Sequence, residues 1–319
     1  MLLQLCAPLT AVFNVLPGSI ADGFIWSILT IGVFISYKIL NIADMSVEGT
    51  FALGGTVTAA LLTIGVPVSV AMIVGAIGGF IAGVFTAILH TKLKIPAILS
   101  GILTMFILYS INIHVLGNKA SLALLGRITL MRKLAEATSP MVANLIVGGI
   151  FALLTVGASY WFFGTKYGSS VRATGCNPEM ARAQGINTDG RIILTLGISN
   201  ALAALSGSLL AQSNNNVTAN MGSGAIVIGL AGVVLGEAFV KEKWPFAFRL
   251  IGVLAGSVLY RIVIALALQL LNGFLTADDM KLISAVLIIA VLAAKRFSAK
   301  RPLKTKSNNL SENLNAENK

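Results

Sequence analysis

Few residues of this 319-residue sequence are placed for catalysis or metal binding. His90 and His114 stand near the ends of apolar stretches and have no second ligand at the spacing of a metal site, so no metal is predicted. Cys6 and Cys176 also lack such spacing and are interpreted as structurally neutral. No Ser/His/Asp triad, paired-carboxylate pattern or G-x-x-x-x-G-K-[ST] phosphate loop emerges. Catalytic chemistry, including ATP hydrolysis, is therefore not predicted for this chain.

Three charged side chains lie inside apolar stretches: Glu48, Glu237 and Arg261. A charge in such surroundings needs a partner or a water-filled cavity. Glu48 and Glu237 stand near the ends of their stretches, where the simplest interpretation is helix capping or pairing with cations of the loops. Arg261 stands in the middle of its stretch. It either pairs with a carboxylate inside the protein or faces a route through it, where a guanidinium would bind a solute carboxylate.

The composition places these charges in a membrane. Hydrophobic residues make up 56% of the chain and charged residues 11%, with a mean hydropathy of +0.88, whereas soluble domains are roughly 45–50% apolar. The 32 glycines suit membrane helices that pack closely. Since about 20 apolar residues cross a bilayer as a helix, we predict an all-α, polytopic bundle with about 8–10 transmembrane helices, including broken or re-entrant segments.

These helices are predicted to form one domain over residues 1–296, followed by a basic, disordered tail at 297–319. The start, 1–16, is interpreted as an interfacial helix that ends at Pro17-Gly18, with a short, tilted span as the alternative. The loop 117–140 is interpreted as a helix on the membrane surface. Gly54-Gly55 indicate either a broken segment beside a pathway or close helix packing. The predicted spans are residues 24–40, 47–64, 68–89, 97–116, 141–163, 192–211, 222–239, 246–271 and 282–294.

The longest polar interruption, residues 167–191, contains signals for a short helix of its own. Asn177 is a good N-cap, and Pro178 fits the first helical position. Gly185 offers a left-handed stop, beyond which Ile186 can fold back onto the helix. Such a helix has about two turns at 3.6 residues per turn. Because so short a helix is marginal in water by itself, we expect it to dock against another surface.

Three stretches resemble the permeases of ABC importers, of the branched-chain amino acid and ribose type. The first joins R-A-T-G-C-N-P at 172–178 to S-N-A-L-A-A-L-S-G at 199–207. The second is N-I-A-D-M-S-V-E-G-T-F-A-L-G-G at 41–55, and the third is G-S-G-A-I-V-I-G-L-A-G-V-V-L-G-E at 222–237. The second stretch is similar to the early signature of a subfamily labelled as tryptophan/tyrosine or uncharacterised amino acid permeases.

This resemblance implies the transmembrane subunit of an ATP-driven importer. It would move a small solute, an amino acid by preference, from an extracytoplasmic binding protein into the cytoplasm by alternating access. The implied partners are a second permease copy forming a homodimer, two cytosolic ABC ATPase subunits, the solute-binding protein and membrane lipid, with no nucleic acid. ATP-Mg would be bound by the partner ATPase, and no cofactor by this chain.

The resemblance also assigns residues to two tasks. A cytoplasmic coupling loop, residues 164–191, would carry the short helix that the ATPase subunit grips. The predicted coupling residues are Arg172, Thr174, Gly175, Asn177, Pro178, Glu179, Met180, Ala181, Arg182, Gly185, Ile186 and Asn187. The predicted residues of the translocation pathway are Asn41, Asp44, Glu48, Gly54, Gly55, Gly222, Gly224, Glu237 and Arg261.

The distribution of basic residues predicts the orientation. If the coupling loop is cytoplasmic and the spans alternate, most lysines and arginines fall on the inside, as the positive-inside rule requires. The chain is then a multi-pass protein of the cell (plasma or inner) membrane with a cytoplasmic C-terminus. An ion-coupled secondary transporter or channel is the alternative. Such proteins need ionisable groups near the midplane, where this sequence offers mainly Arg261. A membrane-embedded enzyme would need clustered polar groups, which the sequence does not show.

Overall fold

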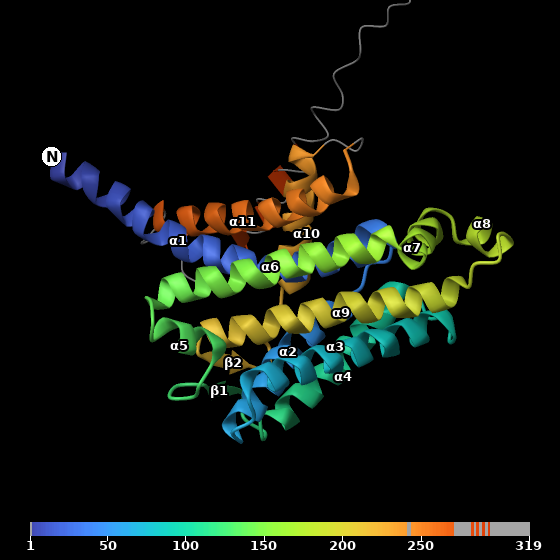
Figure 1. Ribbon diagram of the computed structural model, residues 1–319, viewed down its shortest axis with the longest axis horizontal. Coiled ribbons are helices and arrows are strands. Elements are labelled where there is room, and N and C mark those ends of the chain that lie inside the picture. The colour runs from blue at the N-terminus through green and yellow to red at the C-terminus, as the bar shows by residue number, and fades with distance from the viewer. Residues whose placement is uncertain are drawn as a thin grey trace, which may run out of the picture.

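The computed structural model describes residues 2–240, 244–270, 282–283, 285–286, 289–290 and 293, and these are almost entirely helical (Figure 1). The long helices are α1 (Leu2–Val33), continued by the π-helix η1 (Phe34–Ile39), α2 (Ser46–Thr63), α3 (Val68–Thr91), α4 (Ala97–Val115), α6 (Pro140–Gly164), α9 (Thr188–Ser213), α10 (Ala225–Phe239) and α11 (Phe246–Leu270). The short elements are β1 (Ser121–Ala123), α5 (Leu130–Ala135), α7 (Lys166–Cys176), α8 (Pro178–Ala183) and β2 (Asn216–Thr218).

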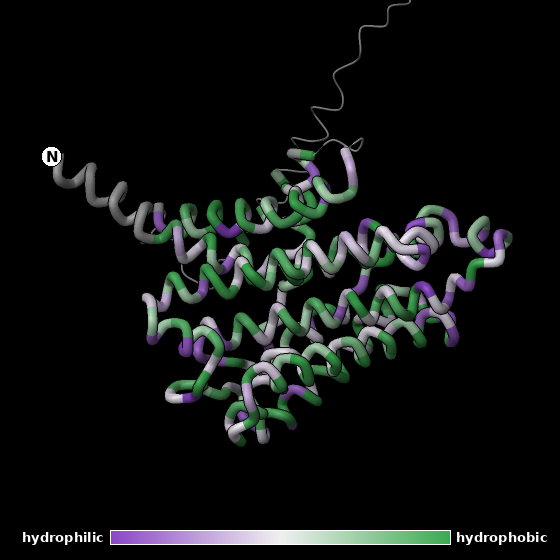
Figure 2. Tube along the Cα trace, in the orientation of Figure 1, coloured by the Kyte–Doolittle hydropathy of each residue, from purple (hydrophilic) through white to green (hydrophobic). Residues whose placement is uncertain are grey.

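Six helices of the described residues are long and apolar enough to cross a membrane. They are Val15–Ile39, Val68–Thr91, Ala97–Val115, Pro140–Gly164, Thr188–Ser213 and Phe246–Gln269. Figure 2 shows apolar residues along the middle of these helices and hydrophilic ones near α8. The predicted polytopic all-α bundle is confirmed. The predicted span at 222–239 begins later, at Ala225, and is a shorter apolar helix. The ninth predicted span and the tail lie largely outside the described residues.

Helices α1 and α9 form the centre of the bundle. The apolar window of α1 is 78% buried and that of α9 67% buried, whereas those of α4 and α6 are each 28% buried. Small and hydroxyl side chains let α9 approach its neighbours closely. The Ser199 hydroxyl donates to the Gly32 carbonyl of α1 at 2.7 Å, and the Ser208 hydroxyl donates to the Gly54 carbonyl of α2 at 2.9 Å. The peripheral helices α4 and α6 therefore have the largest faces left for lipid or another chain.

The glycine pair of α2 serves close packing. Helix α2 runs without a break through Gly54 and Gly55. A Cβ at Gly54 would overlap the backbone of Ala204, and one at Gly55 would lie 2.8 Å from the Met221 sulfur. Of the two interpretations of this pair, the structure shows the packing one, because α2 crosses α9 at backbone contact.

Two predictions about secondary structure were wrong, one on where the first helix ends and one on the loop 117–140. The first helix does not end at Pro17-Gly18, since α1 continues through both residues. A proline removes one backbone donor, and a membrane helix tolerates that loss when neighbouring groups satisfy the freed carbonyl. The loop 117–140 is not one surface helix. It contains β1, which pairs antiparallel with β2 through Leu122 and Val217, and then the six-residue helix α5.

The two ends of the bundle differ in what they carry. At one end, termed here the α5 end, α5 and the β1–β2 pair cover the terminus of α9, and the Leu130 N–H donates to the Gln212 side-chain oxygen at 3.0 Å. At the opposite end, the α8 end, α7 and α8 project beyond the long helices (Figure 1). The polar segment 167–191 therefore lies at one face of the bundle.

Candidate functional site

The helix α8 has the capping structure that its sequence predicts. The Asn177 side-chain oxygen accepts a hydrogen bond from the Met180 N–H at 3.0 Å, and Pro178 occupies the first turn. Gly185 has a φ of +78°, its N–H donates to the Arg182 carbonyl at 2.9 Å, and the Ile186 N–H donates to Ala181 at 3.0 Å. These two bonds form a Schellman motif. Both ends of the helix are thus defined by local sequence.

A second helix, α7, precedes α8 and was not expected from the sequence. Thr165 caps it, with the side-chain oxygen accepting from the Gly168 N–H at 3.3 Å. A Cβ at Gly175 would overlap the carbonyl oxygen of Ile39, so α7 lies directly on the end of η1. The Arg172 guanidinium donates to the Phe163 carbonyl at 3.1 Å, and Thr174 is buried. The polar segment is therefore anchored to the long helices by α7 and presents α8 beyond them.

Side chains also tie α8 to the long helices. The Arg182 guanidinium donates to the Thr188 hydroxyl at 2.6 Å and to Asp189 at 3.1 Å. Asp189 in turn pairs with Lys92, at the end of α3, at 3.3 Å. Asn187 caps α9 by accepting from the Gly190 N–H at 3.0 Å. A displacement of α8 would therefore reach α3 and α9 together.

The exposed side of α8 is suited to a protein partner. Ala181 is 4% exposed and faces the spans, whereas Met180 is 63% exposed. Glu179 is exposed beside it. A large apolar side chain on a rigid, projecting helix is the kind of group that anchors protein interfaces.

Replacing Asp189 with Asn should loosen the segment 177–190, which contains α8 and is called the α8 hairpin below, with little loss of global stability. The ion pairs are surface interactions, since the Arg182 and Lys92 side chains are each 61% exposed, and such pairs contribute about 0.2–1 kcal/mol. Amide hydrogen exchange over residues 177–190 should become faster than in the wild type, and the difference should shrink in high salt. Glu179→Gln, which removes an acid from the same hairpin, is the control. Equal exchange in both variants would show that Asp189 does not hold α8.

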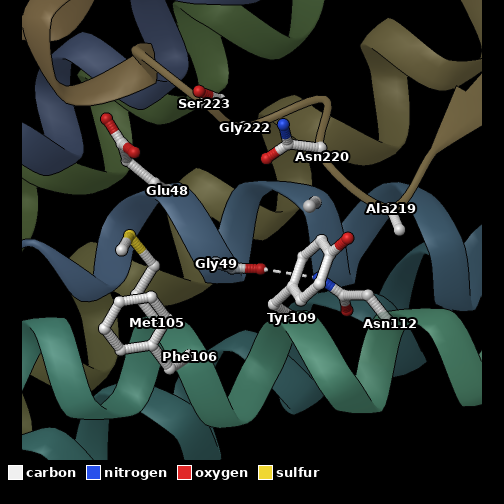
Figure 3. A pocket seen from close by; sticks show the side chains of 11 residues that line it. Glu48, Gly49, Met105, Phe106, Tyr109, Asn112, Ala219, Asn220, Gly222 and Ser223 are labelled. Atoms are coloured by element: carbon white, nitrogen blue, oxygen red, sulfur yellow. Dashed lines mark hydrogen bonds between the residues drawn. The ribbon is translucent and has the colours of Figure 1, made fainter.

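A cavity of about 300 Å³ lies between α2, α4 and the segment 219–223 that leads into α10 (Figure 3). Its floor is formed by α2 and one wall by α4, from which Phe106 and Tyr109 extend. Asn220 and Ser223 lie on the opposite wall (Figure 3). Tyr109 is 46% exposed, so the cavity opens at the side of this chain. An aromatic ring and several neutral polar groups around a cavity can bind a small polar solute.

Backbone contacts hold this cavity in shape. The Asn112 amide donates to the Gly49 carbonyl at 3.3 Å, which joins α4 to α2. The Glu48 carboxylate accepts from the Gly224 N–H at 3.0 Å, and Gly224 has a φ of +86° at the start of α10. A Cβ at Gly222 would overlap the Glu48 carbonyl, so only glycine lets this loop lie on α2. Glu48 thus has the capping role of its simpler interpretation and also lines the cavity.

Seven of the nine predicted pathway residues do not line the cavity: the glycines Gly54, Gly55 and Gly224, described above, and four polar or charged residues. Asn41, with a φ of +59°, forms the turn after η1. Asp44 is buried in a polar network with Ser46 and Asn200. Glu237 pairs with Lys38 at 3.1 Å and with Arg249 at 3.6 Å, as the simpler interpretation of this residue predicts.

Arg261 is the fourth of them. Its guanidinium carbon lies 4.6 Å from the centre of the Trp26 ring of α1, a cation–π contact. Asp22, also on α1, is the carboxylate that acts on it electrostatically. Its contacts therefore join α11 to α1, and Arg261 does not line the cavity between α2 and α4.

Comparison with known proteins decides the family. Residues 16–292 match the family described as "Branched-chain amino acid transport system / permease component". The chain belongs to this family. The resemblance predicted from the three stretches is thereby confirmed, and the chain is a multi-pass membrane permease component.

Known relatives of this permease include transport proteins of several bacteria. It is 39% identical to a tyrosine transport system permease protein of Clostridioides difficile (strain R20291), over 85% of this chain and 88% of the relative. It is 30% identical to an uncharacterized protein of Rickettsia prowazekii (strain Madrid E), over 70% of this chain and 77% of the relative. It is 28% identical to the autoinducer 2 import system permease protein LsrC of Yersinia pseudotuberculosis serotype O:1b (strain IP 31758), over 66% of this chain and 58% of the relative. No solved structure matches the chain.

Sequence reasoning missed several polar residues of the permease. Asn112 is fully buried within α4, and Asn200 within α9, although both lie in strongly apolar stretches. Tyr109 and Asn220 were also not singled out. An amide in the middle of an apolar span was the available signal, because such a group must find hydrogen-bond partners in the membrane.

Proposed function

We propose that this permease is the transmembrane subunit of an ATP-driven importer that carries a small solute, an amino acid, into the cytoplasm. The observation that carries the proposal is α8: a capped, rigid helix that projects from one end of a membrane bundle and exposes Met180. The family match and the relatives' transport roles support it. The tyrosine permease supports an amino acid as the solute.

In this proposal two cytosolic ATPase subunits bind α8 and hydrolyse ATP-Mg, which this chain does not bind. A solute-binding protein delivers the solute at the α5 end. The α8 end is then cytoplasmic, with the C-terminus on the same side, and the protein lies in the cell membrane. The open side of the cavity at Tyr109 faces a second permease copy in a homodimer, so that two copies enclose the route.

The packing supports a path from α8 to the cavity. Closure of the ATPase pair would displace α8, and the Arg182–Asp189–Lys92 contacts would pass that displacement to α3 and α9. Helix α9 meets α2 at Asn200, whose side-chain oxygen accepts from Thr50 at 2.7 Å. Because Glu48 and Gly49 on α2 line the cavity, a shift of α2 against α4 would change its access. This is alternating access in a two-state bundle.

The test is to recover the tagged, full-length permease from its native membrane and identify the proteins that accompany it. An ATPase subunit should be recovered with the wild type and reduced at least tenfold by Met180→Asp, because a charge would enter the centre of the interface. Uptake of labelled amino acids, tyrosine first, should be lost in parallel. Leu125→Asp, at a residue that is 79% exposed near the α5 end, is the control. An intact permease without any ATPase, or equal recovery with Met180→Asp, would refute the proposal.

A further inference from the structure

An apolar groove of about 570 Å³ lies between α3, α6 and α9, away from the solute cavity. Met72, Ile73 and Phe80 of α3 line one side, Phe151 of α6 another, and Leu130 of α5 closes one end. Figure 1 shows α5 crossing near the ends of α6 and α9 at this place. A groove of this composition within the hydrocarbon layer can be filled by an acyl chain or by another helix.

The length of the groove matches one leaflet of a bilayer. It extends along α3 from Ser69 to Phe80, which is roughly 16 Å at 1.5 Å per residue. One leaflet is about half of the roughly 30 Å hydrocarbon core. The groove begins at the end of α3 that is remote from Lys92 and α8, so it spans the leaflet at the α5 end.

A basic hollow adjoins the groove at Ser69. A second cavity, of about 450 Å³, shares Ser69 with the groove and is lined by Arg127 and Lys133. Lys133 stands one turn of α5 after Leu130. No acidic residue lines this hollow, and no ion pair between described residues involves Arg127 or Lys133. The first N–H groups of α3 also lack a side-chain cap there, and such groups favour an anion.

We propose that the groove and the hollow together bind one anionic phospholipid. Its phosphate headgroup lies between Arg127 and Lys133, and one acyl chain lies along α3 as far as Phe80. The basic hollow beside the groove at Ser69 favours this occupant over a further helix, which has no phosphate to pair with Arg127 and Lys133. The described part of the C-terminal segment lies elsewhere, since Ile283 packs against Tyr260 and Ile264 of α11.

The test is native mass spectrometry of the purified, full-length permease titrated with phosphatidylglycerol or phosphatidylethanolamine. The wild type should retain one phosphatidylglycerol selectively. Arg127→Gln with Lys133→Gln should weaken its retention about 25-fold, because each basic group near an anionic lipid contributes roughly fivefold. The control is the double variant Lys119→Gln with Arg132→Gln, which removes the same charge from the same loop but outside this hollow. This variant should retain phosphatidylglycerol as the wild type does.

A second pair of variants tests the acyl chain. Ala76→Phe places a ring in the groove and should abolish selective retention, whereas Ile81→Phe, on the same helix at a residue 62% exposed and outside the groove, should not. Thermal melting of each variant reports whether it is folded. Equal retention of the two lipids, loss in both charge variants alike, or retention in a folded Ala76→Phe protein would each overturn the proposal.

Discussion

Gly54→Ala should prevent the permease from accumulating as a stable, monodisperse protein. The added Cβ would overlap the carbonyl oxygen, carbonyl carbon and Cα of Ala204, which are all backbone atoms of α9. A backbone cannot move aside as a flexible side chain can, so α2 and α9 must separate. Overpacking a rigid site costs about 1–3 kcal/mol and occasionally more, and we expect the upper end here. Fluorescence-detected size-exclusion chromatography after a temperature series gives the loss of stability.

Gly157→Ala is the matched control for this substitution. Gly157 lies in the interior of α6, and nothing lies within 4 Å of a Cβ built on it. Its replacement should not lower the melting temperature, because the methyl group enters open space on a peripheral helix and alanine favours a helix more than glycine does. If the melting temperature of Gly54→Ala equalled those of Gly157→Ala and the wild type, α2 and α9 would not be in the close contact described above.

Asp44→Leu should produce the second large effect, a loss of about 3 kcal/mol. The Asp44 carboxyl is 2% exposed and accepts hydrogen bonds from the Ser46 N–H at 2.9 Å, the Ser46 hydroxyl at 2.6 Å and the Asn200 amide at 2.7 Å. Leucine leaves the Ser46 N–H and one Asn200 amide N–H without their acceptor, while the Ser46 hydroxyl can still donate to the Asn200 side-chain oxygen. Each buried donor without an acceptor costs about 1–3 kcal/mol. Thermal unfolding in detergent measures the change. Ser46→Ala, which removes one donor, should cost far less.

A double-mutant cycle separates this network from simple loss of volume. Asn200→Leu alone removes one hydrogen-bond partner from each of Asp44, Ser46 and Thr50, whereas Asp44→Leu with Asn200→Leu removes both partners of the central bond. The double variant should therefore lose less stability than the sum of the two single losses, by about 1 kcal/mol or more. Strict additivity would contradict a direct bond between the two side chains.

Asp44 and Gly54 both lie where the α2 segment meets α9. Both residues were predicted to line the translocation pathway, and the structure places both in the contact between α2 and α9. Glu48, in the first turn of α2, lines the cavity with Gly222, whereas Asp44 precedes the helix. Substitutions at Asp44 or Gly54 would destabilise the bundle, so a loss of transport in these variants would not by itself assign either residue to the translocation pathway.

Some features of this permease follow from the sequence by itself. The apolar helices are predictable in outline because hydrocarbon admits only helices whose backbone is satisfied internally. Hydropathy nevertheless predicted nine spans, whereas six of the described helices are long and apolar enough to cross a membrane, and the predicted span at 47–64, now α2, is not among them. The helix α8 is predictable because Asn177, Pro178 and Gly185 act on their own backbone neighbours. The pairing of Glu237 with cations was the simplest interpretation of its position near a span end.

Other features were decided by tertiary structure. Whether Gly54 breaks α2 or lets α9 approach depends on a helix 150 residues later in the chain, and no local signal identifies that partner. Arg261 was compatible with a carboxylate partner and with a pathway, and only the packing of α11 on α1 shows that Trp26 lies beside it. The cavity likewise combines α2, α4 and the segment before α10, which are distant in sequence. Local sequence determines hydrogen bonds within a few residues, whereas the neighbours of a buried side chain are set by how whole helices pack.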